Sequence, residues 1–248
     1  MKYKLEDVEF LVLVHFDSIQ RLENALAVVK YLTSNFDTNI CVWEVGRRNN
    51  HIFEKLMPKG IEYSFIQDYD VVLHRTKYIN GMLRSSTSLY VAIWDVDVIT
   101  PILQILDSVR SLREGFDFVY PYDKLFCDVT YEIRDMFLDS MNVDLLMDLR
   151  YFMPLWYKPN PVGGAFFANR ESYIRSGGEN ENFYGWGIED GERYNRWLNN
   201  NYLIKRIRGC IFHLPHPRGL NSKMNTEDSD IVKTRFFLSS VKIRNNEG

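Results

Sequence analysis

The sequence predicts an α/β fold in which a doubly wound, mostly parallel sheet has helices on both faces. Three observations predict it: a nearly continuous apolar run at residues 9–16, a helix-spaced apolar face directly after it, and repetition of this strand-then-helix order up to residue 100. The first run, EFLVLVHF, has the character of a strand that is covered on both faces. In such folds ligands bind at the carboxyl ends of the strands, so we expect the functional site there.

The elements of the first hundred residues can be justified in chain order. After the first strand, Ser18 is a candidate N-cap of a helix, because its hydroxyl can accept from the free N–H groups of the first turn. The inner face of that helix repeats every three or four residues, at Leu22, Ala25, Leu26, Val29 and Leu32. Further elements are predicted as strands at residues 39–45, 62–66 and 89–94 and as a helix at 75–86.

The elements beyond residue 100 are less regular. Pro101 suits the first turn of a helix, residues 116–120 favour a strand, and residues 128–149 favour one helix with a broad apolar face. Residues 151–187 are rich in proline, glycine and aromatic side chains. This composition is typical of a loop-rich binding surface, here around a strand at 164–168.

The last part of the chain contains a helix, a strand and a polar segment. The helix is predicted at residues 189–200 and the closing strand at 203–212. Residues 221–248 are polar and are expected to form a tail, with a helix only near 231–241.

Composition excludes several classes of protein. With 46% hydrophobic residues, 16 Phe, 15 Tyr and 5 Trp, the chain can fill a large core, which excludes a disordered or fibrous protein. A net charge of −3 gives no field that would attract nucleic acid, so we expect no nucleic-acid partner. The three cysteines, Cys41, Cys127 and Cys210, lack the number and spacing of a disulfide framework or structural zinc site. No apolar run reaches the roughly 18 residues of a membrane-spanning helix, so we expect a soluble, cytoplasmic protein.

The sharpest local feature is the D-x-D sequence Asp95-Val96-Asp97, which directly follows the apolar strand at residues 89–94. Alternate residues of a strand project to the same side, where a divalent cation can bind both carboxylates. The alternative is that a strand leaving the core meets two solvated acids. The position of the D-x-D sequence at the carboxyl end of a strand favours the metal site over this alternative.

A second feature is the sequence GWGIED at residues 185–190, in which glycines flank Trp186 and two acids open a helix. Acids are favoured in a first helical turn, so Glu189 and Asp190 are also explained by the helix dipole alone. The dipole does not explain the tryptophan, whose flat face suits stacking on a sugar ring. A carboxylate beside such a ring can accept a hydroxyl proton, which suggests a carbohydrate ligand.

Three further groups of residues are candidates for binding. His213 and His216 follow the last strand, where a neutral imidazole can ligate a metal, and Pro215 between them favours His213. Arg75 opens a helix, where its planar fork suits a diphosphate, although ordinary surface charge is the alternative. Gly163 and Gly164 begin a strand and permit a ligand to approach the backbone, unless they only form a bulge.

Four motifs in this order resemble those of the beta-1,4-galactosyltransferase family and its bacterial, family 2-like relatives. They are RTKYING at residues 75–81, WDVD at 94–97, GGAF at 163–166 and GWGIED at 185–190. The resemblance covers roughly residues 72–100 and 160–216, and the first strand and helix resemble the opening of GT-A glycosyltransferases. The chain departs from the family with Gly191 after the acid pair and with Cys210 where animal members have methionine. The cysteine leaves the choice between Mn²⁺ and Mg²⁺ open.

The resemblance implies a role for each matching residue. It assigns metal binding to three residues and catalysis to Asp190 as the general base. The implied metal ligands are Asp97, His213 and Asp95. The implied donor-binding residues are Arg75, Asp95, Val96, Asp97 and Arg21, and the implied acceptor-binding residues are Trp186, Glu189 and Gly164. Retaining relatives carry asparagine at the position of Asp190, and an amide cannot act as a base, so the aspartate favours inversion.

The resemblance also implies a domain plan and a function. A single GT-A catalytic domain is expected over residues 1–220, with a nucleotide-sugar half at about 1–100 and an acceptor half at about 101–220. It would move a hexose or N-acetylhexosamine from a UDP-sugar to a glycan or lipid-linked sugar in bacterial surface polysaccharide or lipopolysaccharide synthesis, with peripheral membrane contact. Two alternatives stay open: a non-catalytic subunit that binds nucleotide sugar or glycan, and a haloacid-dehalogenase phosphatase, which also places D-x-D after an apolar strand.

Overall fold

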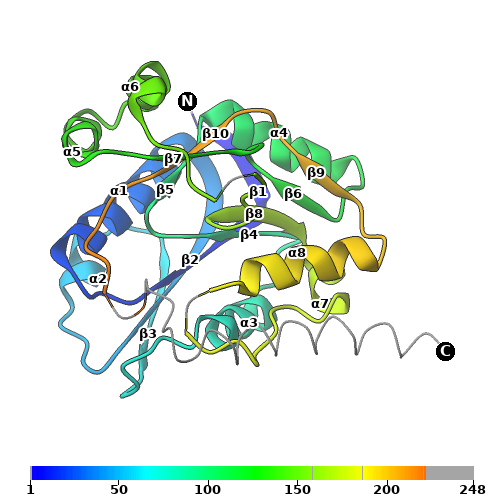
Figure 1. The fold of residues 1–248 in the computed structure, drawn as a ribbon. Helices are drawn as coiled ribbons and strands as arrows, with labels where there is room; N and C mark the ends of the chain where they lie inside the picture. The colour runs from blue at the N-terminus through cyan, green and yellow to red at the C-terminus, as the bar shows by residue number, and fades with distance from the viewer. Residues whose placement is uncertain (1, 158, 186, 220, 222–248) are drawn as a thin grey trace.

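The computed structural model describes residues 2–157, 159–185, 187–219 and 221 (Figure 1). The helices and strands are β1 (Tyr3–Val14), α1 (Ile19–Asn35), β2 (Phe36–Gly46), α2 (Ile52–Leu56), β3 (Glu62–Gln67), α3 (Arg75–Ser85), β4 (Tyr90–Trp94), β5 (Val98–Ile99), α4 (Ile102–Arg113), β6 (Phe118–Tyr120), β7 (Leu125–Asp128), α5 (Tyr131–Ser140), α6 (Val143–Leu149), the 3-10 helix η1 (Arg150–Phe152), β8 (Ala165–Asn169), α7 (Arg170–Arg175), α8 (Glu189–Asn199), β9 (Ile204–Arg206) and β10 (Cys210–His213). The alternation predicted for the first hundred residues is confirmed. Trp186 and residues 222–248, including the predicted tail helix, lie outside the described residues.

Within the described residues the main sheet has seven strands in the order β3-β2-β1-β4-β8-β6-β9. The first four are parallel to one another, β8 is antiparallel to both of its neighbours, and β9 is parallel to β6. Figure 1 shows α1 and α4 on one side of this sheet and α3, α7 and α8 on the other. The predicted doubly wound, mostly parallel sheet is therefore confirmed.

Helix α1 forms as its sequence predicts. The hydroxyl of Ser18 accepts a hydrogen bond from the backbone N–H of Arg21, so the serine is the N-cap. Ala25, Val29 and Leu32 are buried in the hydrophobic core, whereas Leu22 and Leu26 are partly buried against it. Among the described helices, none is both long and apolar enough to cross a lipid bilayer.

The single helix predicted over residues 128–149 is wrong. The structure has the end of strand β7 and two helices, α5 and α6, which are separated at Met141, where the backbone is left-handed with φ 52°. Thr130 caps the first helix and Asn142 caps the second, each by accepting from a backbone N–H of the following turn. The apolar spacing continues across the break, so periodicity alone could not show it.

The closing strand predicted over residues 203–212 is also wrong, because β9 and β10 belong to different sheets. The chain leaves the main sheet near Gly209, at φ 144°, and β10 then lies parallel to β7 and antiparallel to β5. The side chain of Gln104 fills the position of a glycine Cβ there and donates to the carbonyls of Pro121 and Cys210. This change of sheet brings the carboxyl end of β10 beside that of β4.

Candidate functional site

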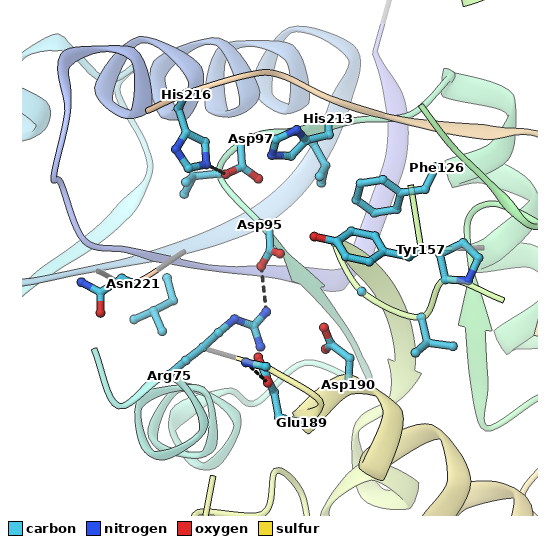
Figure 2. Close-up of a pocket in the computed structure, with 18 of the residues that line it drawn as sticks. Arg75, Asp95, Asp97, Phe126, Tyr157, Glu189, Asp190, His213, His216 and Asn221 are labelled. Carbon is cyan, nitrogen blue, oxygen red and sulfur yellow. Dashed lines mark hydrogen bonds and ion pairs between the residues drawn. The ribbon is translucent and has the colours of Figure 1, made fainter. Parts of the chain in front are cut away.

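A cavity of about 390 Å³ lies at the carboxyl ends of β1, β4 and β10 and is closed on one side by the start of α8 (Figure 2). The described residues that line it include Leu13, His15, Arg21, Leu73, Arg75, Asp95, Val96, Asp97, Val98, Phe126, Tyr157, Asn160, Pro161, Val162, Gly163, Gly164, Gly187, Ile188, Glu189, Asp190, His213, His216, Arg218 and Asn221. The cavity is therefore at the edge of the sheet where a doubly wound fold binds its ligands.

One wall of the cavity is a buried cluster of Asp97, His213 and His216. Each offers one ligand atom, and these atoms all lie within 4.8 Å of one another. Nε2 of His216 is 3.2 Å from Oδ2 of Asp97. The backbone fixes the cluster, because the N–H of Leu214 donates to the carbonyl of Asp97 at 2.7 Å. These three side chains can together bind a divalent cation.

Each imidazole is oriented by a partner at its other nitrogen. Nδ1 of His213 lies 2.9 Å from Oδ1 of Asp128, at the end of β7, and Nδ1 of His216 lies 2.8 Å from the carbonyl oxygen of Pro217. With Nδ1 donating in both rings, Nε2 is left to accept a metal. A carboxylate behind a histidine is a frequent arrangement at metal sites, and it also makes the ring a better ligand.

Arg21 and Asp17, in the first turn of α1 and just before it, border the metal cluster. The Nη2 group of Arg21 donates to Nε2 of His216 at 3.1 Å, and Nε is 3.1 Å from Oδ1 of Asp17. Burial opposes ionisation of Asp97, but its contact with His216 and the charges of His213 and Arg21 hold the pKa of Asp97 well below its usual range. Asp97 is therefore a carboxylate at neutral pH.

Arg75 and Asp95 form an ion pair across the middle of the cavity, at 2.7 Å. Burial raises the pKa of Asp95 against the opposing charge of Arg75, and the carboxylates of Asp97 and Asp190 raise it further. The Nη1 group of Arg75 is buried and has no hydrogen-bond partner among the described residues. A buried donor of this kind is costly unless a ligand accepts from it, which indicates a polar ligand at this point.

The start of α8 forms the wall opposite the metal cluster, as Figure 2 shows. Ile188 precedes the helix with a left-handed backbone, φ 52°, which is strained for a β-branched residue. Glu189 is buried and accepts a hydrogen bond from the N–H of Gly187 at 2.8 Å. Burial raises the pKa of Glu189 to about 7, and the charge of Asp190 also raises it.

Asp190 points into the cavity and is held on two sides. Its Oδ1 accepts from Nη2 of Arg193 at 2.7 Å, and its side chain is 30% exposed. A Cβ at Gly163 would lie 2.7 Å from Oδ2 of Asp190, so a glycine is required for this close approach. Gly164 follows with φ 81° and lies against Phe126. The first glycine of the GGAF motif thus lies against Asp190 of the GWGIED motif.

The structure brings together the predicted site residues that it describes. Arg21, Arg75, Asp95, Val96, Asp97, Gly164, Glu189, Asp190 and His213 all line the cavity, and Trp186 lies outside the described residues. Cys210 does not join the three cavity residues that could hold a metal, and its side chain is buried in the hydrophobic core.

Sequence reasoning missed three residues of the site and ranked a fourth low. It ranked His216 below His213, although both rings approach Asp97, and it did not single out Asp128, Arg193 or Tyr157. Tyr157 has a left-handed backbone, φ 55°, and its ring meets the edge of Phe126 with centroids 5.3 Å apart. Spacing gave no signal for Asp128, because it acts on His213 from a different strand. Arg193 does follow Asp190 at the i, i+3 spacing of a helix, but nothing in the sequence pointed to its second partner, Glu179.

The chain is similar in sequence to known galactosyltransferases. Residues 149–217 match the family model described as the N-terminal domain of galactosyltransferase. Beta-1,4-galactosyltransferase 7 of Mus musculus and of Homo sapiens are each 26% identical to the chain over 155 residues, which is 62% of this chain and 35% of each relative. The vegetative-specific protein H5 of Dictyostelium discoideum is 30% identical over 126 residues, or 50% of this chain and 35% of that protein. The chain thus spans about a third of the length of these relatives.

Solved structures show the same fold at low sequence identity. The catalytic domain of Drosophila beta-1,4-galactosyltransferase 7, in complex with xylobiose, superposes with a TM-score of 0.58 at 16% identity and covers 93% of this chain and 79% of its own. A mannosyltransferase of Pyrobaculum calidifontis, in complex with GDP-Man and Mn²⁺, has a TM-score of 0.56 at 16% identity, with 86% and 58% covered. The chain therefore has the GT-A glycosyltransferase fold and, as its motifs predicted, resembles the beta-1,4-galactosyltransferase family.

Proposed function

We propose that the protein is a metal-dependent glycosyltransferase that moves a hexose or N-acetylhexosamine from a UDP-sugar to a glycan hydroxyl, with inversion. One observation carries the proposal: a single cavity has the cluster of Asp97, His213 and His216 on one wall and the carboxylate of Asp190 on the other. A single displacement needs charge stabilisation on the leaving side and a base on the acceptor side. A variant of the Drosophila enzyme was solved with manganese, UDP-Gal and xylobiose, which supports this assignment.

The residues present fit a manganese ion. Two imidazoles and a carboxylate form a mixed nitrogen and oxygen donor set, whereas Mg²⁺ prefers oxygen ligands and water. Asp97, His213 and His216 would hold the ion, and Asp95 lies at the same strand end, where it can bind the ion or the nucleotide ribose. When bound, the ion would stabilise the negative charge that develops on the diphosphate leaving group.

The donor side of the cavity is lined by arginines. Arg21 lies beside the metal cluster, and the partnerless Nη1 of Arg75 is a buried donor that a phosphate or sugar oxygen can satisfy. Val96, between the two acids, also lines the cavity and would contact the nucleotide. Because the leaving diphosphate is a stable anion, this side needs no proton donor.

The acceptor side contains the proposed base. As the acceptor oxygen bonds to the anomeric carbon and the bond to the diphosphate breaks, the hydroxyl proton passes to Asp190. Glu189 is less suited to this task, because it is buried and bound to the N–H of Gly187. We therefore assign Glu189 and Gly164 to holding the sugars, together with Trp186 on the strength of its motif. Tyr157, whose ring borders the same space, is a further candidate for the acceptor wall.

We also propose a biological setting for the reaction. The resemblance to bacterial enzymes suggests an acceptor in surface polysaccharide or lipopolysaccharide, and a cytoplasmic protein that meets lipid-linked sugars at the membrane. A panel of soluble and lipid-linked acceptors, assayed with the donor identified below, tests this part separately.

A donor-hydrolysis screen tests the function without knowledge of the acceptor. UDP-galactose, UDP-GalNAc, UDP-GlcNAc and UDP-glucose are incubated with the protein and Mn²⁺, and UDP release is measured. We expect slow release from one or two donors, and loss of that release in the Asp97→Asn variant or with a chelator. UDP binding without release from any donor, and without transfer to the acceptor panel, would favour a binding subunit. Release of phosphate from an aryl phosphate would favour a phosphatase.

A further inference from the structure

Arg193 is a buried arginine one helical turn after Asp190. Its side chain is 1% exposed, and its two terminal nitrogens bind two different carboxylates. Nη2 donates to Oδ1 of Asp190 at 2.7 Å, and Nη1 donates to Oε1 of Glu179 at 2.8 Å. One planar guanidinium thus links the acid that faces the cavity to an acid that is itself 1% exposed.

The guanidinium is fixed by its surroundings. It lies over the ring of Phe166, on β8, at 4.3 Å from the ring centroid, and its Nη2 also points to the carbonyl oxygen of Val162 at 3.3 Å. On the far side, Oε1 of Glu179 also accepts from the hydroxyl of Tyr173 at 2.5 Å. Arg193 therefore has little freedom to rotate, since both its plane and its ends are held.

The charges explain why both carboxylates are needed. A buried guanidinium is costly unless its charge is balanced, and Glu179 balances it in the interior. The second edge of the fork then holds Asp190 by a charge-assisted hydrogen bond. Since this bond occupies Oδ1, the other carboxylate oxygen, Oδ2, lies against Gly163.

We infer that Arg193, anchored by Glu179, is the positioning residue for Asp190. The inference rests on the proposed function, in which Asp190 is the base. The pair fixes the rotamer of Asp190 so that Oδ1 is occupied and Oδ2 receives the acceptor proton. The fork of an arginine is required, because an ammonium group cannot bind two separated carboxylates with the same geometry.

Arg196 provides a matched control on the same helix. It is also buried and also pairs with a glutamate, Glu192, at 2.9 Å, but it binds the carbonyl oxygen of Gly178 rather than a cavity residue. Loss of either fork therefore disturbs a buried ion pair of α8. Only the loss of the Arg193 guanidinium removes the hydrogen bond that holds Asp190.

The test compares Arg193→Lys with Arg196→Lys. With the donor and acceptor found by the screen, we expect Arg193→Lys to lower kcat for transfer at least tenfold with the donor KM unchanged, while Arg196→Lys stays within threefold of wild type. Melting temperatures report any common loss of stability. Equal losses of kcat in the two variants, or full kcat in Arg193→Lys, would overturn the inference.

Gly163→Ala approaches the same carboxylate from the other side. Gly163 has no left-handed φ, so alanine fits the backbone, but its methyl group would meet Oδ2 of Asp190. We expect a fall in kcat of at least tenfold in a variant that folds and binds UDP with Mn²⁺.

Crystal structures separate this inference from the proposed function. In Arg193→Lys the carboxylate of Asp190 should change rotamer, whereas in Arg196→Lys it should not. An unmoved Asp190 in Arg193→Lys contradicts the positioning role, whatever the activity. A wild-type protein with no hydrolysis and no transfer contradicts the proposed function instead, and the crystal structures still decide the role of Arg193.

Discussion

Helices α1 and α8 both begin at the cavity, yet they pack against the rest of the protein in opposite ways. The first turn of α1 supplies Arg21, and its inner face is apolar. The first turn of α8 supplies Glu189 and Asp190, and most of its buried side chains are charged. The buried residues of α8 are Glu189, Glu192, Arg193, Arg196 and Trp197.

The difference indicates a division of labour between stability and placement. Apolar contacts are non-directional, so an apolar face such as that of α1 stabilises the fold and tolerates small shifts. Buried ion pairs contribute little net stability, but each requires its partner in a set direction. The charged face of α8 therefore fixes the helix against its partners, and Arg193 within that face fixes Asp190. The N-termini of the two helices show the same division. Helix α1 has a serine cap, whereas α8 follows the strained Ile188 without a side-chain cap.

The largest expected effect compares the two first turns. Asp190→Asn should reduce transfer about 10²- to 10⁴-fold, the usual range for loss of a general base, with binding of UDP and Mn²⁺ nearly intact. Arg21→Gln should instead raise the donor KM more than it lowers kcat. Steady-state kinetics and calorimetry with UDP check both. Unchanged turnover in Asp190→Asn would remove the base assignment.

The next effect compares the two inner faces. Leu32→Ala in α1 leaves a cavity and should lower the free energy of unfolding by about 2–5 kcal/mol. Glu192→Gln in α8 leaves the buried charge of Arg196 without its partner and should cost about 3–5 kcal/mol. Adding Arg196→Gln to Glu192→Gln should recover part of that cost, and denaturant unfolding measures it. No coupling between Glu192 and Arg196 would mean that charge does not hold α8 in place.

A smaller effect is expected for Asp128, which orients a metal ligand as Arg193 orients Asp190. Asp128 orients His213 from behind, so Asp128→Asn should weaken Mn²⁺ binding about 10- to 100-fold, the usual range for such partners. His213→Ala and His216→Ala should each weaken it at least as much. Titration of donor hydrolysis against Mn²⁺ ranks the three variants, and wild-type affinity in His216→Ala would exclude that ring from the site.

The smallest effect concerns pH. Burial, with the charge of Asp190, raises the pKa of Glu189 from an ordinary 4.5 to about 7. Between these values the folded state holds a proton that the unfolded chain has lost, so the free energy of unfolding falls as pH rises through this window. Glu189→Gln should remove that fall, which is about 1.4 kcal/mol per pH unit inside the window. Thermal unfolding of both proteins at pH 4.5 and 7.5 measures the difference, and an identical pH dependence would contradict the assignment.

The sequence predicted the regular half of the molecule well. The apolar runs of β1 and β4 and the helical spacing of α1 follow from local periodicity, which depends on neighbouring residues alone. The same spacing failed at Met141, because the break there results from a left-handed residue between two capped helices. It failed again at Gly209, where the chain changes sheets.

Some residues of the candidate site could be predicted from the sequence and others could not. Asp95, Asp97 and Asp190 carry a signal in short motifs, because their spacing follows from one strand end and one helix start. Asp128 carries none, because it acts on His213 from another strand. For Arg193 the i, i+3 spacing from Asp190 is visible in the sequence, but its anchoring by Glu179 is not.

The sequence by itself determined the sheet-and-helix alternation, the acids at the end of β4 and the acid pair that opens α8, because each depends on residues adjacent in the chain. Only the tertiary structure decided that both imidazoles approach Asp97 and that Arg193 joins Glu179 to Asp190. Such contacts exist only after folding has removed water and brought distant charges within hydrogen-bond distance, where their direction becomes decisive.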